Sequence, residues 1–213
     1  MTDFAASETN ICNLALQQMG RPIIIASLSE DSNAARLCAR QYPISRDAVL
    51  RAYPWNFAQR RDELDAHNDT PAFEFAYMYE LPSDYLGNLR LFDNDSERFK
   101  IETYVESTAS SIRVVLTDVG EPLQVKYTAR ITDPTLFDPL FIDALAAHVG
   151  ANIAVALSES QSKAEQLWSV YSAKLREARA VDASEDTADA MPQGNWVSDR
   201  FSSGVAPYKD FIP

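Results

Sequence analysis

The sequence predicts an α+β protein: an antiparallel helical bundle with an inserted small antiparallel β-region and an extended C-terminal arm. Three observations support this prediction. Two long helical patterns follow one another between Asp133 and Asp182. Apolar and polar residues alternate repeatedly between residues 73 and 131, as they do in strands. Residues 188–213 show neither period.

The two helical patterns predict a hairpin on which the other elements pack. The first is apolar on nearly every face, which indicates a helix surrounded by protein. Its apolar residues include Leu136, Phe137, Leu140, Phe141, Leu145, Val149, Ile153 and Leu157. The second is apolar along one stripe and should be half-buried. That stripe comprises Ala164, Leu167, Trp168, Tyr171, Leu175 and Ala178. The link at residues 158–160 is short, which favours antiparallel neighbours, and Ser158 or Ser160 can cap the second helix.

Residues 1–72 are predicted to hold the N-terminal helices of the bundle. The first helix begins near Ser7. Gly20, with Pro22 two residues later, ends it. The second begins near Ser29. Pro43 lies inside the second pattern and is expected to kink or split it, because proline lacks the N–H group and clashes with the preceding turn.

The aromatic stretch Tyr53–Ala58 ends the second helical pattern. Two bulky rings, Trp55 and Phe57, lie close to Pro54 in this stretch. Such a wedge is typical of the closing end of a helical core. An aromatic ligand site is the alternative interpretation.

The β-region is predicted at residues 73–131, between the N-terminal helices and the hairpin. The expected strands are Phe73–Glu80, Leu89–Phe92, Phe99–Glu106, Ser111–Thr117 and Leu123–Arg130. Gly120, Glu121 and Pro122 predict that the last two strands form a hairpin. Residues 132–187 then complete the bundle with the helical hairpin.

Residues 188–213 are predicted to form the extended C-terminal arm. Within them, Ser198–Pro213 is rich in Ser, Gly and Pro, so alone it should be extended or disordered. Yet they carry more large apolar side chains than a solvent tail usually has. These residues are Trp196, Val197, Phe201, Tyr208, Phe211 and Ile212. We expect them to bind a partner and to order there, with a tail folded back onto its own subunit as the alternative.

Charge and composition limit the classes of function. The 213 residues carry a net charge of −12, which counts against a chain-wide nucleic-acid-binding surface. Arg51, Arg60 and Arg61 could form a local basic patch, and solvated helix ends are the alternative. The stretch Ile142–Leu157 is interrupted by polar residues and is expected to be too short for a membrane span. The N-terminus shows no signal-peptide pattern.

No motif predicts an enzyme, and the sequence suggests no catalytic, metal-binding or cofactor-binding residues. Common nucleotide-binding, serine-hydrolase and zinc-protease motifs are absent. Cys12 and Cys38 are expected to be buried free thiols, with a disulfide or a reactive thiol as the alternative. His67 is expected on a solvated loop and His148 within a packed helix. Abundant carboxylates leave open a hydrolase that uses an Asp/Glu pair.

Several segments, taken together and in order, resemble one family. They are Asn10–Leu16 with Gly20, Ala35, Tyr42, Arg46–Asp47, Leu50, Tyr53–Ala58, Tyr79–Asp84, Tyr127–Arg130 with Asp133, Phe141 with Ala144–Ala146, and Tyr171 with Leu175. Pro-Trp-Asn-Phe-Ala followed by Leu-Pro-Ser-Asp is the most specific combination. Over most of Glu8–Ala183 the chain resembles the tail tubular protein A family, the head-to-tail adaptors of short-tailed bacteriophages. Residues 86–121 and the arm from Ala188 onward show no such match.

The resemblance implies a structural virion protein rather than an enzyme. Members of the family form a dodecameric ring below the portal protein, extend the DNA channel and support the tail nozzle, a tail tubular protein B-like component. The resemblance therefore implies a homo-oligomer of twelve copies, which is made in the host cytoplasm and lies in the phage neck. Trp55 and Phe57 would be core packing, and no membrane would be involved. Double-stranded DNA would pass without specific binding, because an acidic channel wall repels phosphates.

Two other functions are kept as alternatives. The first is a tail-associated hydrolase of cell wall or polysaccharide, because a tail component can meet the cell envelope. The second is an α+β oligomerisation module of cellular origin. Within the adaptor hypothesis, the arm could bind either the portal protein or an adjacent subunit.

Overall fold

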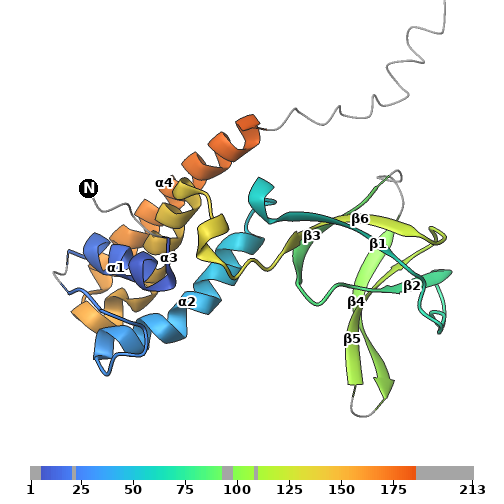
Figure 1. Ribbon diagram of the computed structural model, residues 1–213, viewed down its shortest axis with the longest axis horizontal. Coiled ribbons are helices and arrows are strands. Elements are labelled where there is room, and N and C mark those ends of the chain that lie inside the picture. Colours follow the sequence, from blue (N-terminus) through green and yellow to red (C-terminus); the bar gives the residue numbers. More distant parts are fainter. Residues whose placement is uncertain (1–5, 21–22, 93–97, 108–109, 186–213) are drawn as a thin grey trace, which may run out of the picture.

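Helices and sheets occupy two separate lobes of an elongated molecule (Figure 1). The computed structural model describes residues 6–20, 23–92, 98–107 and 110–185. Within them, four α-helices form the helical lobe and two small antiparallel sheets form the β-lobe. The predicted α+β class is therefore confirmed, whereas the C-terminal arm lies outside the described residues.

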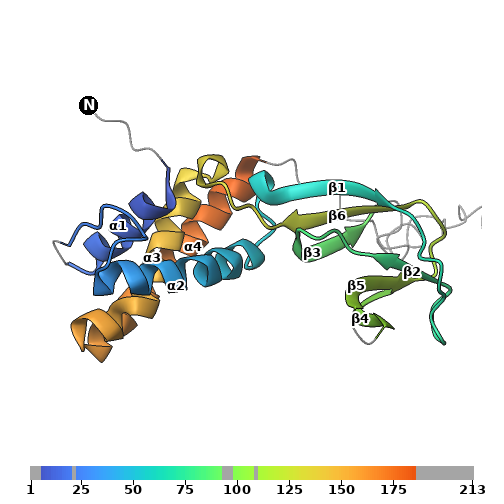
Figure 2. The ribbon, with the colours of Figure 1, turned by 60° about the horizontal axis from the view of Figure 1, so that its bottom comes forward.

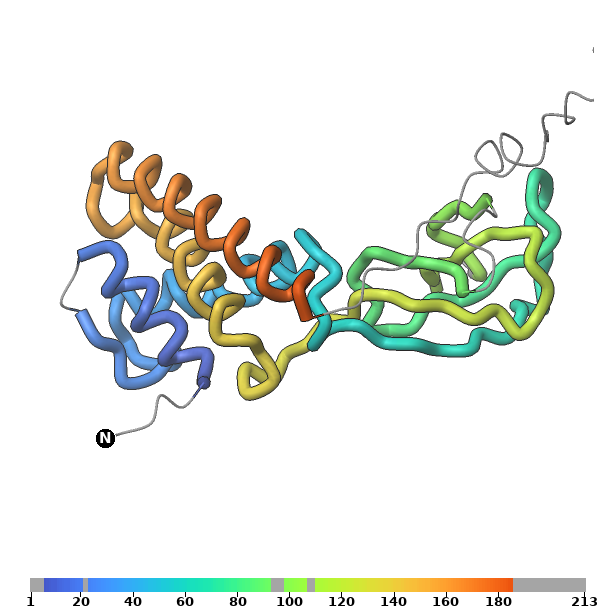
Figure 3. Tube along the Cα trace, turned by 90° about the horizontal axis from the view of Figure 1, so that it is seen from above, coloured from blue at the N-terminus to red at the C-terminus, as the bar shows by residue number. Residues whose placement is uncertain are grey.

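The most apolar helix lies at the centre of the helical lobe. The helices are α1 (Glu8–Gln18), α2 (Asn33–Arg51), α3 (Pro139–Ser158) and α4 (Gln161–Glu185). Because α3 is apolar on nearly every face, it packs against α1, α2 and α4. Figure 3 shows α4 running back alongside α3 over most of its length. The predicted hairpin is therefore confirmed.

Local sequence determines where the hairpin helices begin and end. The Asp138 carboxylate accepts hydrogen bonds from the N–H groups of Leu140 and Phe141, at 2.8 and 3.2 Å, and so caps α3. At the other end, Glu159 adopts a left-handed conformation with φ 53°. Ser160, one of the two predicted caps, then accepts a hydrogen bond from the N–H of Lys163 at 3.4 Å.

Pro43 does not split the second helix, so that part of the prediction is wrong. α2 runs without a break through Pro43, whose ring lies exposed. Tyr42 and Val49, on either side of the proline, are both buried against the core and hold the two halves of the helix in place. The helix ends at Arg51, directly before the aromatic stretch that was predicted to end it, and a short 3₁₀ helix, η1 (Asn56–Ala58), follows.

The β-lobe consists of two three-stranded antiparallel sheets (Figure 2). Their strands are β1 (Gln59–Leu64), β2 (Tyr77–Glu80), β3 (Tyr85–Leu91), β4 (Phe99–Ser107), β5 (Ser110–Thr117) and β6 (Leu123–Ala129). The strand orders are β1-β6-β3 and β2-β5-β4. The predicted hairpin between the last two strands is therefore wrong, because β5 pairs with β2 and β4 whereas β6 pairs with β1 and β3. A 3₁₀ helix, η2 (Pro134–Leu136), then connects β6 to the helical hairpin.

The β-lobe begins earlier than the sequence predicts. β1 falls within residues 1–72, which were expected to contain only bundle helices and loops. Its sequence, Gln-Arg-Arg-Asp-Glu-Leu, lacks apolar alternation because most of its side chains are exposed. Backbone pairing with β6 makes it a strand. Conversely, the predicted strand from Phe73 only begins at Tyr77, and Phe73 is 80% exposed.

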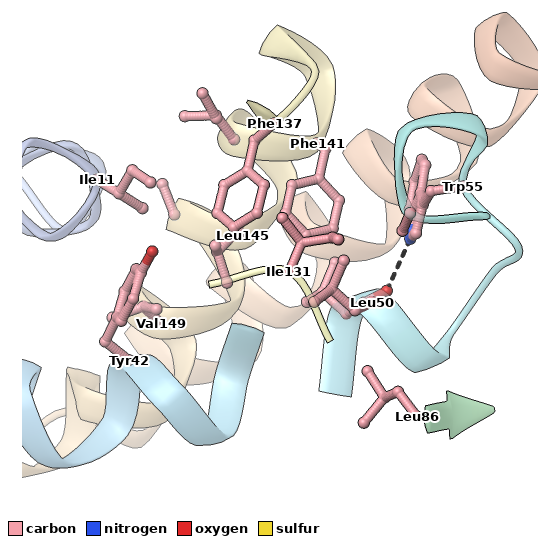
Figure 4. Packing of buried hydrophobic residues seen from close by; sticks show 14 of the residues in the cluster. Ile11, Tyr42, Leu50, Trp55, Leu86, Ile131, Phe137, Phe141, Leu145 and Val149 are labelled. Atoms are coloured by element: carbon pink, nitrogen blue, oxygen red, sulfur yellow. Dashed lines mark hydrogen bonds between the residues drawn. The ribbon is translucent and has the colours of Figure 1, made fainter. Parts of the chain in front are cut away.

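One hydrophobic core extends through both lobes. It includes Ile11, Tyr42 and Leu145 in the helical lobe together with Leu86 and Tyr127 in the β-lobe. Figure 4 shows the part of this core where Phe137, Phe141 and Trp55 meet beside Leu50 and Ile131. A second, smaller cluster of Phe75, Met78, Val114 and Leu116 lies at the sheet β2-β5-β4, which we call the outer sheet. The lobes are therefore joined by packing rather than by a loose linker.

Helices α1 and α3 approach each other closely at Gly150. A Cβ atom at this position would lie 3.2 Å from the carbonyl oxygen of Ala15. We therefore expect Gly150→Val to lower the free energy of unfolding by about 1–3 kcal/mol, because the helices must move apart. Urea denaturation of the variant measures this. Ala173→Val, on the exposed face of α4, is the control and should cost less than about 1 kcal/mol. Equal losses in both variants would contradict the close approach.

Candidate contact surface

All the side chains predicted to bind a partner lie outside the described residues. They are Trp196, Val197, Phe201, Tyr208, Phe211 and Ile212. The structure shows where their segment begins, which is at the end of α4. The C-terminal end of α4 lies near the junction between the two lobes (Figure 3).

Polar contacts fix the end of α4 to this junction. The buried carboxylate of Asp182 accepts the backbone N–H of Asn56, with N–O distances of 3.2 and 3.3 Å. The Asn56 amide in turn donates to the Asp182 carbonyl oxygen at 2.9 Å. One turn earlier, Arg179 donates to the carbonyl oxygen of Ala52 at 2.6 Å and lies over the ring of Tyr53. The segment that follows α4 therefore starts from a fixed position.

Trp55 fills the interior of the junction. Its side chain is fully buried, and its indole N–H donates to the carbonyl oxygen of Val49 at 3.0 Å. Its ring meets Phe141 edge-on at 5.2 Å between centroids, and Phe57 packs on the same Phe141 at 5.0 Å. This packing agrees with the role that the resemblance implies for Trp55 and Phe57. A ligand cannot stack on a tryptophan that has no exposed surface.

One aspartate ties the helical lobe to the β-lobe, and a second ties together elements of the β-lobe. Asp47 of α2 bridges Arg46 and Arg130, at 2.8 and 2.9 Å. Asp84 accepts a hydrogen bond from the Tyr127 hydroxyl at 2.9 Å and pairs with Arg60 at 3.2 Å. Arg60, from the predicted basic patch, is therefore neutralised by a carboxylate.

A second aromatic group lies on the outside of the hairpin, and we call it the hairpin aromatic cluster: His148, Trp168 and Tyr171. The His148 ring meets Trp168 and Tyr171 at centroid distances of 5.2 and 4.8 Å. Burial lowers the pKa of His148, as expected for a histidine in a packed helix. Trp168 is 41% exposed although the sequence pattern places it in the buried stripe. It stands at the edge of that stripe, where helical periodicity cannot separate buried from half-exposed residues.

One surface recess of the described residues, about 460 Å³ in volume, is lined by residues that include Asp62 and Glu63. These residues are consecutive on β1, so their side chains point to opposite faces of the sheet and do not form a facing acid pair. Among the described residues, no group of three or more His, Cys, Asp or Glu side chains could hold a metal ion.

The two cysteines are buried free thiols in the structure, as predicted. A hydrogen bond with Cys38, together with burial, raises the pKa of Cys12, so the thiol stays protonated. The His67 side chain is only 16% exposed, and its ring meets Tyr104 at 5.6 Å between centroids. The prediction of a solvated loop for this histidine is therefore only partly met.

Helix α3 has the length and composition of a membrane span, contrary to the expectation that this stretch is too short. Its mean hydropathy is 1.8 over a helix of 20 residues. However, 61% of its most apolar window is buried inside the molecule. Packing against the other helices accounts for this apolar character without a membrane.

The Asp182 contact can be tested by removing its carboxylate. We expect Asp182→Ala to lower the free energy of unfolding by about 1–3 kcal/mol, because the N–H of Asn56 loses its acceptor. Chemical denaturation measures the change. Glu177→Ala, at an exposed position of the same helix, is the control and should cost less than about 0.5 kcal/mol. A loss at Asp182 no larger than that at Glu177 would rule out the anchoring role.

His148 should make stability depend on pH. Because its folded pKa lies below the ordinary value of 6.5, the unfolded chain takes up the proton first. The stabilisation is complete above pH 6.5 and is lost as the pH falls below it. Unfolding of the wild type and His148→Asn should be compared at pH 7.5 and 5.5. The fall in unfolding free energy should be smaller in the variant, and an equal fall would contradict the assignment.

No protein-family model matches this chain, and no curated protein matches it in sequence. The resemblance to tail tubular protein A proteins therefore stays a prediction from sequence motifs. What the structure adds is a rigid junction, a fixed start for the C-terminal segment and a half-exposed aromatic cluster.

Proposed function

We propose that this chain is the head-to-tail adaptor of a short-tailed bacteriophage. Twelve copies form a ring between the portal protein and the tail nozzle and extend the DNA channel. The helical lobe serves as the antiparallel bundle of that ring, and residues 188–213 serve as its extended arm. The protein acts by binding other virion components and not by transforming a substrate.

The observation that carries the proposal is the fixed start of the C-terminal segment. Asn56 and Arg179 hold the end of α4 at the junction of the lobes. The residues beyond it, 186–213, could span at most about 100 Å when fully extended. A rigid body followed by a segment with several large apolar side chains is suited to binding a neighbouring component. The sequence motifs of the chain also resemble those of adaptors.

Exposed apolar side chains on both lobes also favour an assembly role. Ile24 and Ile44 of the helical lobe are 82% and 63% exposed, and Val105 of the β-lobe is 65% exposed. A protein with a complete core has no need of them for folding, whereas contacts with other subunits would bury them. Repeated around a ring, individually weak contacts give strong attachment through multivalency.

The charge of the chain fits a channel component. A net charge of −12 repels the phosphates of DNA, so the double helix can pass without being held. A basic wall would instead retain it. Acidic subunits also repel one another at a distance, which keeps them apart until specific contacts form.

The arm can be tested by truncation after Ala190, which removes all six apolar arm residues. We expect the truncated chain to bind purified portal rings at least about tenfold more weakly, because each copy loses its attachment. Sedimentation of chain and portal mixtures measures the binding. Its unfolding transition should match that of the full chain, since the core lies within residues 6–185.

A full-length variant provides the matched control for this truncation. Trp196→Ser with Phe211→Ser should reproduce most of the loss, whereas Asp199→Asn with Arg200→Gln should not. If the truncated chain binds as tightly as the full one, the arm has no such role. Electron microscopy of the full chain with portal tests the wider proposal, because it should show rings stacked below the portal.

A further inference from the structure

Helix α2 is basic although the chain as a whole is strongly acidic. It contains four arginines and one aspartate, in a protein with a net charge of −12. Two of the arginines are paired, Arg46 with Asp47 and Arg36 with Asp31. The other two, Arg40 and Arg51, are exposed, and neither pairs with a carboxylate of the described residues. Their charge is available to a partner.

The unpaired arginines share one side of the molecule. Arg40, Ile44 and Arg51 follow at spacings of four and seven, so they lie on one face of α2. Ile44 stands between them and is 63% exposed. Its neighbour Pro43 is exposed as well. This face therefore combines positive charge with apolar surface.

The same surface continues onto the β-lobe. Arg51 lies over Gly87 of β3 and donates to the carbonyl oxygen of Leu86 at 3.4 Å. Arg113 of β5, also without a carboxylate partner in the described part of the chain, lies over the Tyr85 ring at 4.9 Å. α2 packs against β3, and the contact between Arg113 and Tyr85 joins β5 to β3. We call Arg40, Ile44, Arg51 and Arg113 the arginine face.

The outer sheet carries the opposite charge on its other surface. Glu80 of β2 and Glu102 of β4 flank Val114 of β5 in the same register, so the two carboxylates share one face. Both are exposed, as is Glu106 further along β4, and no ion pair to the three is found where the structure is described. Arg113 precedes Val114 and therefore points to the opposite face of this sheet. We call Glu80, Glu102 and Glu106 the acidic face.

We propose that the arginine face of one copy binds the acidic face of the next copy. The two faces have opposite charge, and Arg113 points away from the side of the outer sheet that carries the glutamates. They are therefore two different surfaces, as a head-to-tail contact requires. An exposed isoleucine and proline among arginines are typical of a protein partner, since a phosphate backbone offers charge but little apolar surface. This inference rests on the proposed adaptor function, for which it names the subunit contact.

Charge reversal on each face tests the contact. Arg40→Glu with Arg51→Glu, and separately Glu80→Lys with Glu102→Lys, should each weaken self-association of the full chain at least about tenfold, measured by sedimentation at low salt. Lys163→Glu with Arg176→Glu, which makes on α4 the same charge change as the arginine variant, is the control and should assemble like the wild type. Unfolding curves establish that each variant is folded.

Mixing the two reversed variants gives the decisive measurement. Each variant repels itself, but in an equal mixture every reversed face meets its complement, so alternating copies should assemble again. Recovery supports the contact and also excludes misfolding as the cause of the loss. If the variants assemble normally alone, or if the mixture does not recover, the contact is wrong.

Two further outcomes would also overturn the inference. If the arginine variant assembles normally but binds short duplex DNA more weakly than the wild type, the arginine face binds nucleic acid and not a second copy. If the wild type does not self-associate, with or without portal rings, the adaptor function fails together with this contact. Assembly of the wild type and of both variants would remove only the contact.

Discussion

The burial of α3 is the constraint on which the rest of the structure depends. This helix is apolar on nearly every face, so it cannot lie at a surface without exposing apolar area to water. Phe141, Leu145 and Val149 are fully buried, and each contributes about 1.5–3 kcal/mol through the hydrophobic effect. Helices α1, α2 and α4 cover it, each with its own apolar face. The arrangement of the helical lobe therefore follows from one helix.

The same helix also makes the two lobes a single body. Trp55 and Phe57 pack against Phe141, and they lie between the N-terminal helices and the first strand. Around this aromatic centre, Asp47 and Asp182 bind groups from elements distant in sequence. Packing supplies most of the stabilisation, whereas the polar contacts fix which surfaces meet, because hydrogen bonds and ion pairs require specific geometry. The surfaces offered to partners are consequently held in fixed relative positions.

For a protein that works by fitting between others, the distribution of charge matters as much as its sum. The sequence shows a net charge of −12, but the structure separates unpaired arginines from unpaired glutamates on two faces. A uniformly acidic subunit would only repel its copies, whereas separated faces permit contact in one orientation. The strong overall charge and an ordered assembly are therefore compatible.

The sequence by itself determined the four described helices, the hairpin, the buried thiols and the α+β class, because periodicity and capping act within a few residues. It did not determine β1, which is a strand only because β6 pairs with it. Nor did it show that Arg130 pairs with Asp47, 83 positions away, while Arg40 pairs with no carboxylate of the described residues. Which charges are neutralised, and which apolar rings remain at the surface, depends on contacts between distant segments. Only the tertiary structure decides these contacts, because local patterns carry no information about partners far along the chain.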